Sequence, residues 1–155
     1  MKTTFRILFC LLLSVAALSA VGEEQEKIEA GITFTQAELG QMLAPVALYP
    51  DTVLSHLLIA ATYPLEVVQA ERWASTHNDL SGTDALKNVE GEDWDPSVKA
   101  LVPFPNVLKQ MSDDLSWTQS LGEAFLQDEE RVLDTVQKLR QRAYKEGSLD
   151  TMDHV

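Results

Sequence analysis

The sequence predicts an all-α fold: a compact single-domain helical bundle of about five to seven helices, preceded by a signal peptide. Helix-start signals built around proline recur along the chain, and the apolar residues between them follow helical spacing. No stretch of five residues shows clean strand alternation. The predicted layout is a signal peptide over 1–22, a disordered leader over 23–33, a helical domain over 34–146 and a flexible tail over 147–155.

The N-terminus carries the three-part layout of a secretory signal. Lys2 and Arg6 give a short positive region, an apolar run over 7–18 follows, and a small residue at Gly22 fits a cleavage site. The run is too short for a membrane-spanning helix, which needs roughly 20 apolar residues. We therefore expect export to the periplasm or the medium, with an uncleaved N-terminal anchor as the alternative.

Cleavage changes the charge and the redox chemistry of the chain. The whole chain has a net charge of −12, and loss of Lys2 and Arg6 leaves 10 basic against 24 acidic residues, a net charge of −14. The single cysteine, Cys10, leaves as well, so disulfides cannot stabilise the domain. Strong negative charge argues against nucleic acid and anionic membranes as partners. We expect an envelope protein or wall component as the partner, and no stable membrane span after cleavage.

The domain begins with a helix-capping motif. Thr35 and Glu38 match a capping box, in which each side chain satisfies a free backbone amide of the other residue. This motif predicts a helix over 36–44. The next predicted helix, over 51–61, is apolar around most of its circumference, which places it at the centre of the core. Its large apolar residues are Val53, Leu54, Leu57, Leu58 and Ile59.

An aromatic or acidic residue followed by proline marks the other helix starts. Proline suits the first helical turn, where its missing amide hydrogen costs nothing, and a preceding aromatic ring can pack on the next turn. These prolines are Pro50, Pro64, Pro96 and Pro105. The helices predicted from the last three are 64–76, 96–101 and 105–113, and residues 83–88 are either helical or part of a polar connection.

The C-terminal part predicts one long amphipathic helix. Ser116 and Gln119 form a second capping box, and the apolar stripe that follows extends to Lys145, continuous or broken at Asp128. Basic residues near the end of this helix, Arg140 among them, complement the negative end of its dipole.

Several motifs, taken in order, resemble an uncharacterised bacterial envelope family, the domain of unknown function 3300. The similar segments are 34–39, 43–51, 71–73, 94–101 and 104–105. The resemblance covers roughly residues 34–146 and implies a Gram-negative envelope protein with a shared helical fold. It implies no activity, so no catalytic residue can be transferred. Many members continue into a β-rich and low-complexity region, and we expect this chain to be a short form without that extension.

No catalytic, metal or cofactor motif stands out, so we expect no metal and no cofactor, and the sequence favours a protein that is not an enzyme. The candidate binding residues lie near the aromatic–proline motifs and are Tyr49, Asp51, Tyr63, Glu66, Arg72 and Trp73. The tryptophans Trp73, Trp94 and Trp117 are interpreted as core residues, with a ligand groove as the alternative. His56 is expected to be buried and hydrogen-bonded.

Three functions remain open at this point. The first is a non-catalytic helical module that binds another component of the cell envelope. The second is an enzyme acting on cell-wall polymer with Glu66 or Asp51 as the acid, although an acid in the first turn of a helix also simply complements the dipole. The third is an acidic protein that sequesters a cationic ligand, as the charge suggests.

Overall fold

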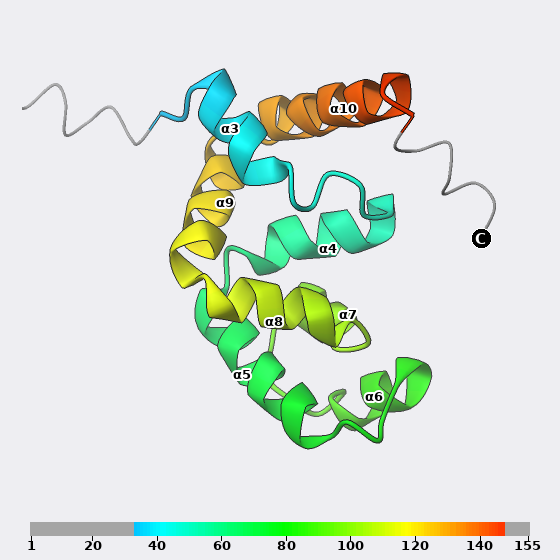
Figure 1. The fold of residues 1–155 in the computed structure, drawn as a ribbon. Coiled ribbons are helices and arrows are strands. Elements are labelled where there is room, and N and C mark those ends of the chain that lie inside the picture. The colour runs from blue at the N-terminus through cyan, green and yellow to red at the C-terminus, as the bar shows by residue number, and fades with distance from the viewer. Residues whose placement is uncertain (1–32, 148–155) are drawn as a thin grey trace, which may run out of the picture. The chain divides into compact units, whose positions relative to one another are not determined.

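Eight α-helices and no strand occur within residues 33–147, the range that the computed structural model describes (Figure 1). They are α3 (Gln36–Leu43), α4 (Asp51–Ala60), α5 (Pro64–Thr76), α6 (Gly82–Asn88), α7 (Pro96–Leu101), α8 (Pro105–Asp113), α9 (Leu115–Gln127) and α10 (Glu129–Lys145). The all-α prediction is confirmed, but five to seven helices was too few. The segment around α6 is helical, and the C-terminal helix is divided at Asp128. The predicted signal peptide, the leader up to residue 32 and the tail from residue 148 lie outside the described range.

All four of these prolines lie at the predicted helix starts, three of them as the first residue of their helix. Pro64, Pro96 and Pro105 are the first residues of α5, α7 and α8. Pro50 differs, because it precedes α4 as its N-cap and provides no side-chain hydrogen bond there. Proline therefore fixes where these helices begin through its restricted φ angle and its missing amide hydrogen.

Side-chain caps start the remaining long helices. Thr35 and Glu38 form the predicted capping box of α3, with the Thr35 amide 2.7 Å from the Glu38 carboxylate. The second predicted capping box is wrong. α9 begins two residues earlier than that motif implied, and the carboxylate of Asp114 accepts the Trp117 amide at 2.9 Å. Aspartate is as good an N-cap as serine, and here it lies closer to the preceding helix.

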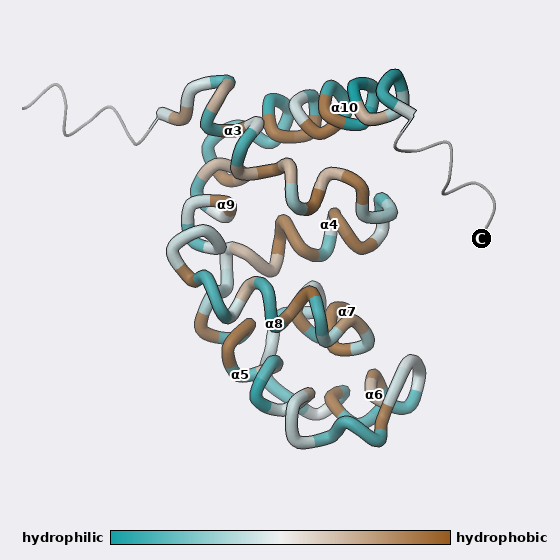
Figure 2. The backbone as a smooth tube through the Cα atoms, viewed as in Figure 1, coloured by the Kyte–Doolittle hydropathy of each residue, from teal (hydrophilic) through white to brown (hydrophobic). Residues whose placement is uncertain are grey.

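The core is centred on α4, as predicted. α4 packs against α7 and α9, while α5 packs against α8 and α3 packs against α10. Hydrophobic residues run along most of α4, whereas hydrophilic residues are frequent on α10 (Figure 2). The buried residues of α4 are Val53, Leu54, Leu57, Leu58 and Ala60. Ile59, predicted to be in the core, is 40% exposed, and His56 is half-buried without a hydrogen bond to the described residues.

The end of α4 approaches α9 unusually closely. A Cβ atom added to Gly122 of α9 would lie 2.4 Å from the carbonyl oxygen of Ala61 and 2.7 Å from its carbonyl carbon. Real side chains do not approach backbone atoms so closely, so only glycine permits this contact. One turn earlier in α9, the hydroxyl of Thr118 donates to the Met111 carbonyl at 2.7 Å and joins α9 to α8.

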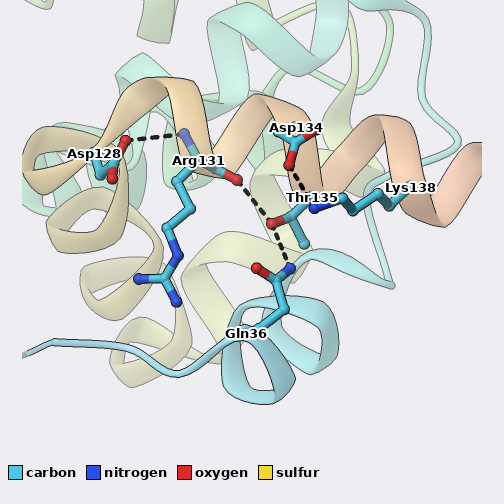
Figure 3. Close-up of polar contacts among 6 residues, drawn as sticks. All are labelled: Gln36, Asp128, Arg131, Asp134, Thr135 and Lys138. Carbon is cyan, nitrogen blue, oxygen red and sulfur yellow. Dashed lines mark hydrogen bonds and ion pairs between the residues drawn. The ribbon is translucent and has the colours of Figure 1, made fainter.

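The first and last described helices pack against each other. The amide of Gln36 in α3 donates to the hydroxyl of Thr135 in α10 at 2.9 Å, and this hydroxyl donates to the Arg131 carbonyl at 2.7 Å (Figure 3). In the same helix Asp128 caps the Arg131 amide, and an exposed ion pair joins Asp134 to Lys138 (Figure 3). The chain is thus closed by contacts between residues almost one hundred positions apart.

Within the described range, no helix on its own combines the length and apolar character needed to cross a membrane. α4 and α5 reach that criterion only when taken together, and they are bent by 118° relative to each other.

Candidate functional site

Arg140 of α10 holds the connection between α3 and α4. Its Nε donates to the carbonyl of Ala47 at 2.6 Å and its Nη2 to the carbonyl of Tyr49 at 2.7 Å. Its remaining terminal nitrogen forms an ion pair with Asp51, the first residue of α4. The planar guanidinium can make these three bonds at once, which an ammonium group cannot do with the same geometry. The backbone before α4 is therefore fixed from across the domain.

Two of the predicted binding residues lie at this place. Tyr49 and Asp51 line an open hollow of about 320 Å³ together with Leu48, Pro50 and Arg140. The side chain of Asp51 is 82% exposed and that of Arg140 only 20%, so the carboxylate faces solvent while the guanidinium is largely covered. Sequence reasoning assigned Arg140 only to the helix dipole and missed this role, because its partners lie about 90 residues away.

A second pair of predicted residues, Tyr63 and Glu66, surrounds the start of α7. The carboxylate of Glu66 accepts the backbone amide of Asp95 at 2.6 Å. Asp95 in turn caps α7 by accepting the Ser97 amide at 2.8 Å. Burial acts to raise the pKa of Asp95, but hydrogen bonds from Ser97 and Tyr63 outweigh it and leave this pKa below its ordinary value. Asp95 is therefore suited to remain a charged cap.

The structure does not bring the two candidate acids together. Asp51 begins α4, Glu66 lies beyond its other end, and a helix of ten residues spans about 15 Å. The paired carboxylates of glycoside hydrolases lie roughly 5–10 Å apart, on either side of the bond that they cleave. The hollow lined by Asp51 includes neither Glu66 nor Arg72. Each acid is engaged by a different structural partner.

The last two candidate residues lie further along α5. Arg72 is exposed, and its side chain forms no hydrogen bond or ion pair with the described residues. Trp73 is half-buried, and its ring stacks on that of His77 with centroids 4.2 Å apart and planes inclined by 12°. His77 Nδ1 also lies 2.8 Å from the Trp73 carbonyl, so this pair closes the end of α5.

A larger hollow, which we call the α3–α9 hollow, lies between α3 and the start of α9. Its volume is about 450 Å³. It is lined by Phe34, Glu38, Gln41, Met42, Asp114, Ser116, Trp117 and Ser120. The indole of Trp117 is half-buried and donates to the Met42 carbonyl at 2.9 Å, which fixes the ring in place. Trp117 therefore fits both interpretations made for the tryptophans, since it packs on the core and lines a groove.

Sequence reasoning missed the other residues of the α3–α9 hollow as site residues. Glu38 was recognised only as a cap. Phe34 was noted only within a family motif. The proline and capping signals predicted that helices begin near these positions, but did not predict that the beginning of α9 lies against α3. Within the described range, no group of three or more His, Cys, Asp or Glu side chains is placed to hold a metal ion.

Comparison with known proteins agrees with the resemblance noted in the sequence. Residues 35–155 match a family model described as "Protein of unknown function (DUF3300)". The chain is 46% identical over 116 residues to "Uncharacterized protein YacH" of Escherichia coli (strain K12). The match covers 75% of this chain but only 19% of YacH, so the chain spans about a fifth of the length of that relative. No solved structure matches the chain. The chain belongs to the DUF3300 family.

Proposed function

We propose that this protein is a non-catalytic helical module that binds another component of the bacterial cell envelope after export. The observation that carries the proposal is the α3–α9 hollow, which presents a fixed indole ring and a second aromatic ring beside carboxylates and hydroxyls. Aromatic rings held in place contribute contact area at little entropic cost, which is a common basis of protein recognition.

The use of the candidate acids supports a non-catalytic role. Asp51 is paired with Arg140, and Glu66 accepts the amide that begins α7. A general acid needs to lie within hydrogen-bond reach of a substrate atom, and a glycosidase needs a second carboxylate across a cleft. Both acids instead hold helix starts in place. Replacing either of them should therefore affect stability rather than a reaction.

The rigidity of the α3–α9 hollow supports a binding role. Glu38 lies in the capping box of α3, and Asp114 caps α9, so both side chains are held at the ends of regular helices. Groups placed on helices are positioned more accurately than groups on loops. Several lining residues, among them Ser116 and Gln41, are exposed, so the hollow can be reached by a partner protein.

Export to the periplasm is part of the proposal and depends on the signal pattern over residues 1–22. It is tested by expressing the full chain in a Gram-negative host, releasing the periplasm by osmotic shock and measuring the mass of the recovered protein. We expect the mature chain to begin after Gly22. A chain that stays in the cytoplasm with its N-terminus intact would contradict export.

The binding role is tested by site-specific photo-crosslinking in living cells. A benzophenone amino acid replaces Ser116 in the α3–α9 hollow, and a control variant carries it at Thr83 in α6, at the far end of the domain (Figure 1). We expect a discrete crosslinked envelope species from position 116 and none from position 83. If position 116 gives no crosslink, or if both positions give the same products, the proposal is wrong.

A further inference from the structure

We infer that the α3–α9 hollow binds a basic, partly apolar peptide segment of its partner, with one lysine or arginine side chain seated between the two rings and the carboxylates of Glu38 and Asp114. The inference rests on the proposed function and adds the chemistry of the partner. It follows from the charge, the free oxygen atoms and the apolar surface of the hollow.

Both carboxylates keep one oxygen available. Glu38 Oε2 accepts the Thr35 amide at 2.7 Å, and Asp114 Oδ1 accepts the Trp117 amide at 2.9 Å. The second oxygen of each forms no hydrogen bond with the described residues. No lysine or arginine is found among the described residues that line the hollow. A cation entering here thus meets two acceptors that no described side chain already occupies.

The helix dipoles do not reverse this preference. The hollow runs along α3 from Phe34 to Met42, so both ends of the α3 dipole lie along it and largely cancel. The start of α9 adds roughly +0.5 of an elementary charge and the two carboxylates contribute −2, so the local balance is about −1.5 and favours a cation. The backbone and hydroxyl hydrogen bonds from Thr35 hold the pKa of Glu38 below its ordinary value, which keeps this carboxylate charged at neutral pH.

The apolar part of the lining suits the stem of a long basic side chain. Phe34, Met42 and Trp117 are all half-buried and leave part of their apolar surface at the hollow. Lysine and arginine bury their methylene groups along such surface while the charge stays near polar groups, and the charge gains further from lying over an aromatic face.

The shape of the hollow favours a peptide over a small free amine. Sites for small molecules enclose most of the surface of their ligand. Here Glu38, Gln41, Asp114 and Ser116 are all exposed, so the hollow is open along one side. A side chain projecting from an extended backbone can enter it while the rest of the segment lies along α3 and α9. The net charge of −12 attracts basic segments at long range.

Two substitutions remove the charge of the hollow and keep both helix caps. Glu38→Gln preserves the capping box, since glutamine serves at that position, and Asp114→Asn preserves the N-cap of α9. The matched control is the double variant Asp84→Asn with Asp128→Asn. It also loses two negative charges, one at an exposed site and one at the N-cap of α10, outside the hollow. Thermal melts by circular dichroism verify that all variants are folded.

Binding is measured by calorimetry with a nine-residue peptide of glycine, lysine and leucine in equal numbers. We expect the double variant Glu38→Gln, Asp114→Asn to bind at least about fivefold more weakly than the parent chain, and the control to change less than about twofold. Binding should also weaken steeply between 20 mM and 300 mM salt, that is, from about 20 Å to about 6 Å of screening length.

Four results would overturn the inference. The first is that the peptide does not bind, and the second is that both double variants lose the same amount of affinity. The third is that a peptide with glutamate in place of lysine binds equally well. The fourth is that spermidine binds as tightly as the peptide and is weakened as much by Glu38→Gln with Asp114→Asn, which would indicate a site for small amines. The proposed function is tested separately, by the crosslink from position 116. Failure of the basic-peptide inference can therefore be distinguished from failure of the proposed function.

Discussion

At the scale of single residues, Gly122 leaves no room for a side chain. A Cβ atom there would lie 2.4 Å from the backbone oxygen of Ala61, which cannot rotate away as a side chain could. We expect Gly122→Ala to lower the free energy of unfolding by about 1–3 kcal/mol, because α9 and the end of α4 must move apart. Urea unfolding monitored by circular dichroism measures this change.

Gly40 provides the matched control for Gly122. It lies within α3, and a Cβ atom added to it meets nothing within 4 Å. Gly40→Ala should therefore stabilise the protein by about 0.5–1 kcal/mol through the better helix propensity of alanine. If both substitutions have the same effect, the close approach of α9 to α4 does not determine stability.

Arg140 matters through the geometry of its donors more than through its charge. Arg140→Lys keeps the charge, but a single ammonium group cannot reach the carbonyls of Ala47 and Tyr49 and the carboxylate of Asp51 together. We expect this substitution to lower the free energy of unfolding by about 1–3 kcal/mol, since it leaves partly buried carbonyl groups short of donors.

Lys138 on the same helix gives the comparison for Arg140. Its ion pair with Asp134 is exposed, with side-chain exposures of 59% and 55%. Lys138→Met should change the free energy of unfolding by less than about 0.5 kcal/mol, as is usual for exposed pairs within a helix. Equal losses from Arg140→Lys and Lys138→Met in urea unfolding would mean that the guanidinium bonds contribute nothing specific.

At the scale of helices, most starts could be predicted and one could not. Proline at the first position and the capping box of α3 act within one turn of helix, so their signal is present in the local sequence. The start of α9 was misplaced because Ser116 and Asp114 are both acceptable caps, and the choice between them depends on how α8 ends. The exposure of Ile59 was missed for a similar reason, because it depends on which face of α4 its neighbours cover.

The two candidate caps of α9 can be separated by mutation. Asp114→Ala removes the acceptor for the Trp117 amide and should lower the free energy of unfolding by about 1 kcal/mol. Ser116→Ala should have almost no effect, because the Ser116 hydroxyl forms no hydrogen bond with the described residues. If Ser116→Ala lowers stability more than Asp114→Ala in thermal or urea unfolding, Ser116 is the cap of α9, as the sequence predicted.

At the scale of the whole molecule, the candidate site is mostly beyond the reach of sequence reasoning. The chain shows which residues are aromatic or acidic, but the α3–α9 hollow joins residues about 75 positions apart, as in the bond from Trp117 to Met42. Likewise, Tyr49 and Asp51 were chosen as candidates, yet their partner Arg140 is some 90 residues away. Such pairings depend on how the helices pack, which local patterns do not contain.

The excess of acidic residues also acts on the whole molecule. With a net charge of −12, like charges repel more strongly in the compact state than in the unfolded chain. Raising sodium chloride from 10 mM to 200 mM screens this repulsion and should raise Tm by about 2–5 °C, which corresponds to roughly 1 kcal/mol. Differential scanning calorimetry measures the shift, and a Tm that falls with salt would show that attractive ion pairs dominate instead.

The contact between α3 and α10 has a consequence for the order of events during synthesis. Gln36 and its partner Thr135 are 99 positions apart, so α3 leaves the ribosome long before the helix against which it packs. At the usual elongation rates of about 5–20 residues per second, α3 waits about 5–20 s for that partner. During this interval the nascent chain cannot complete its fold, and its apolar helix faces are available to chaperones.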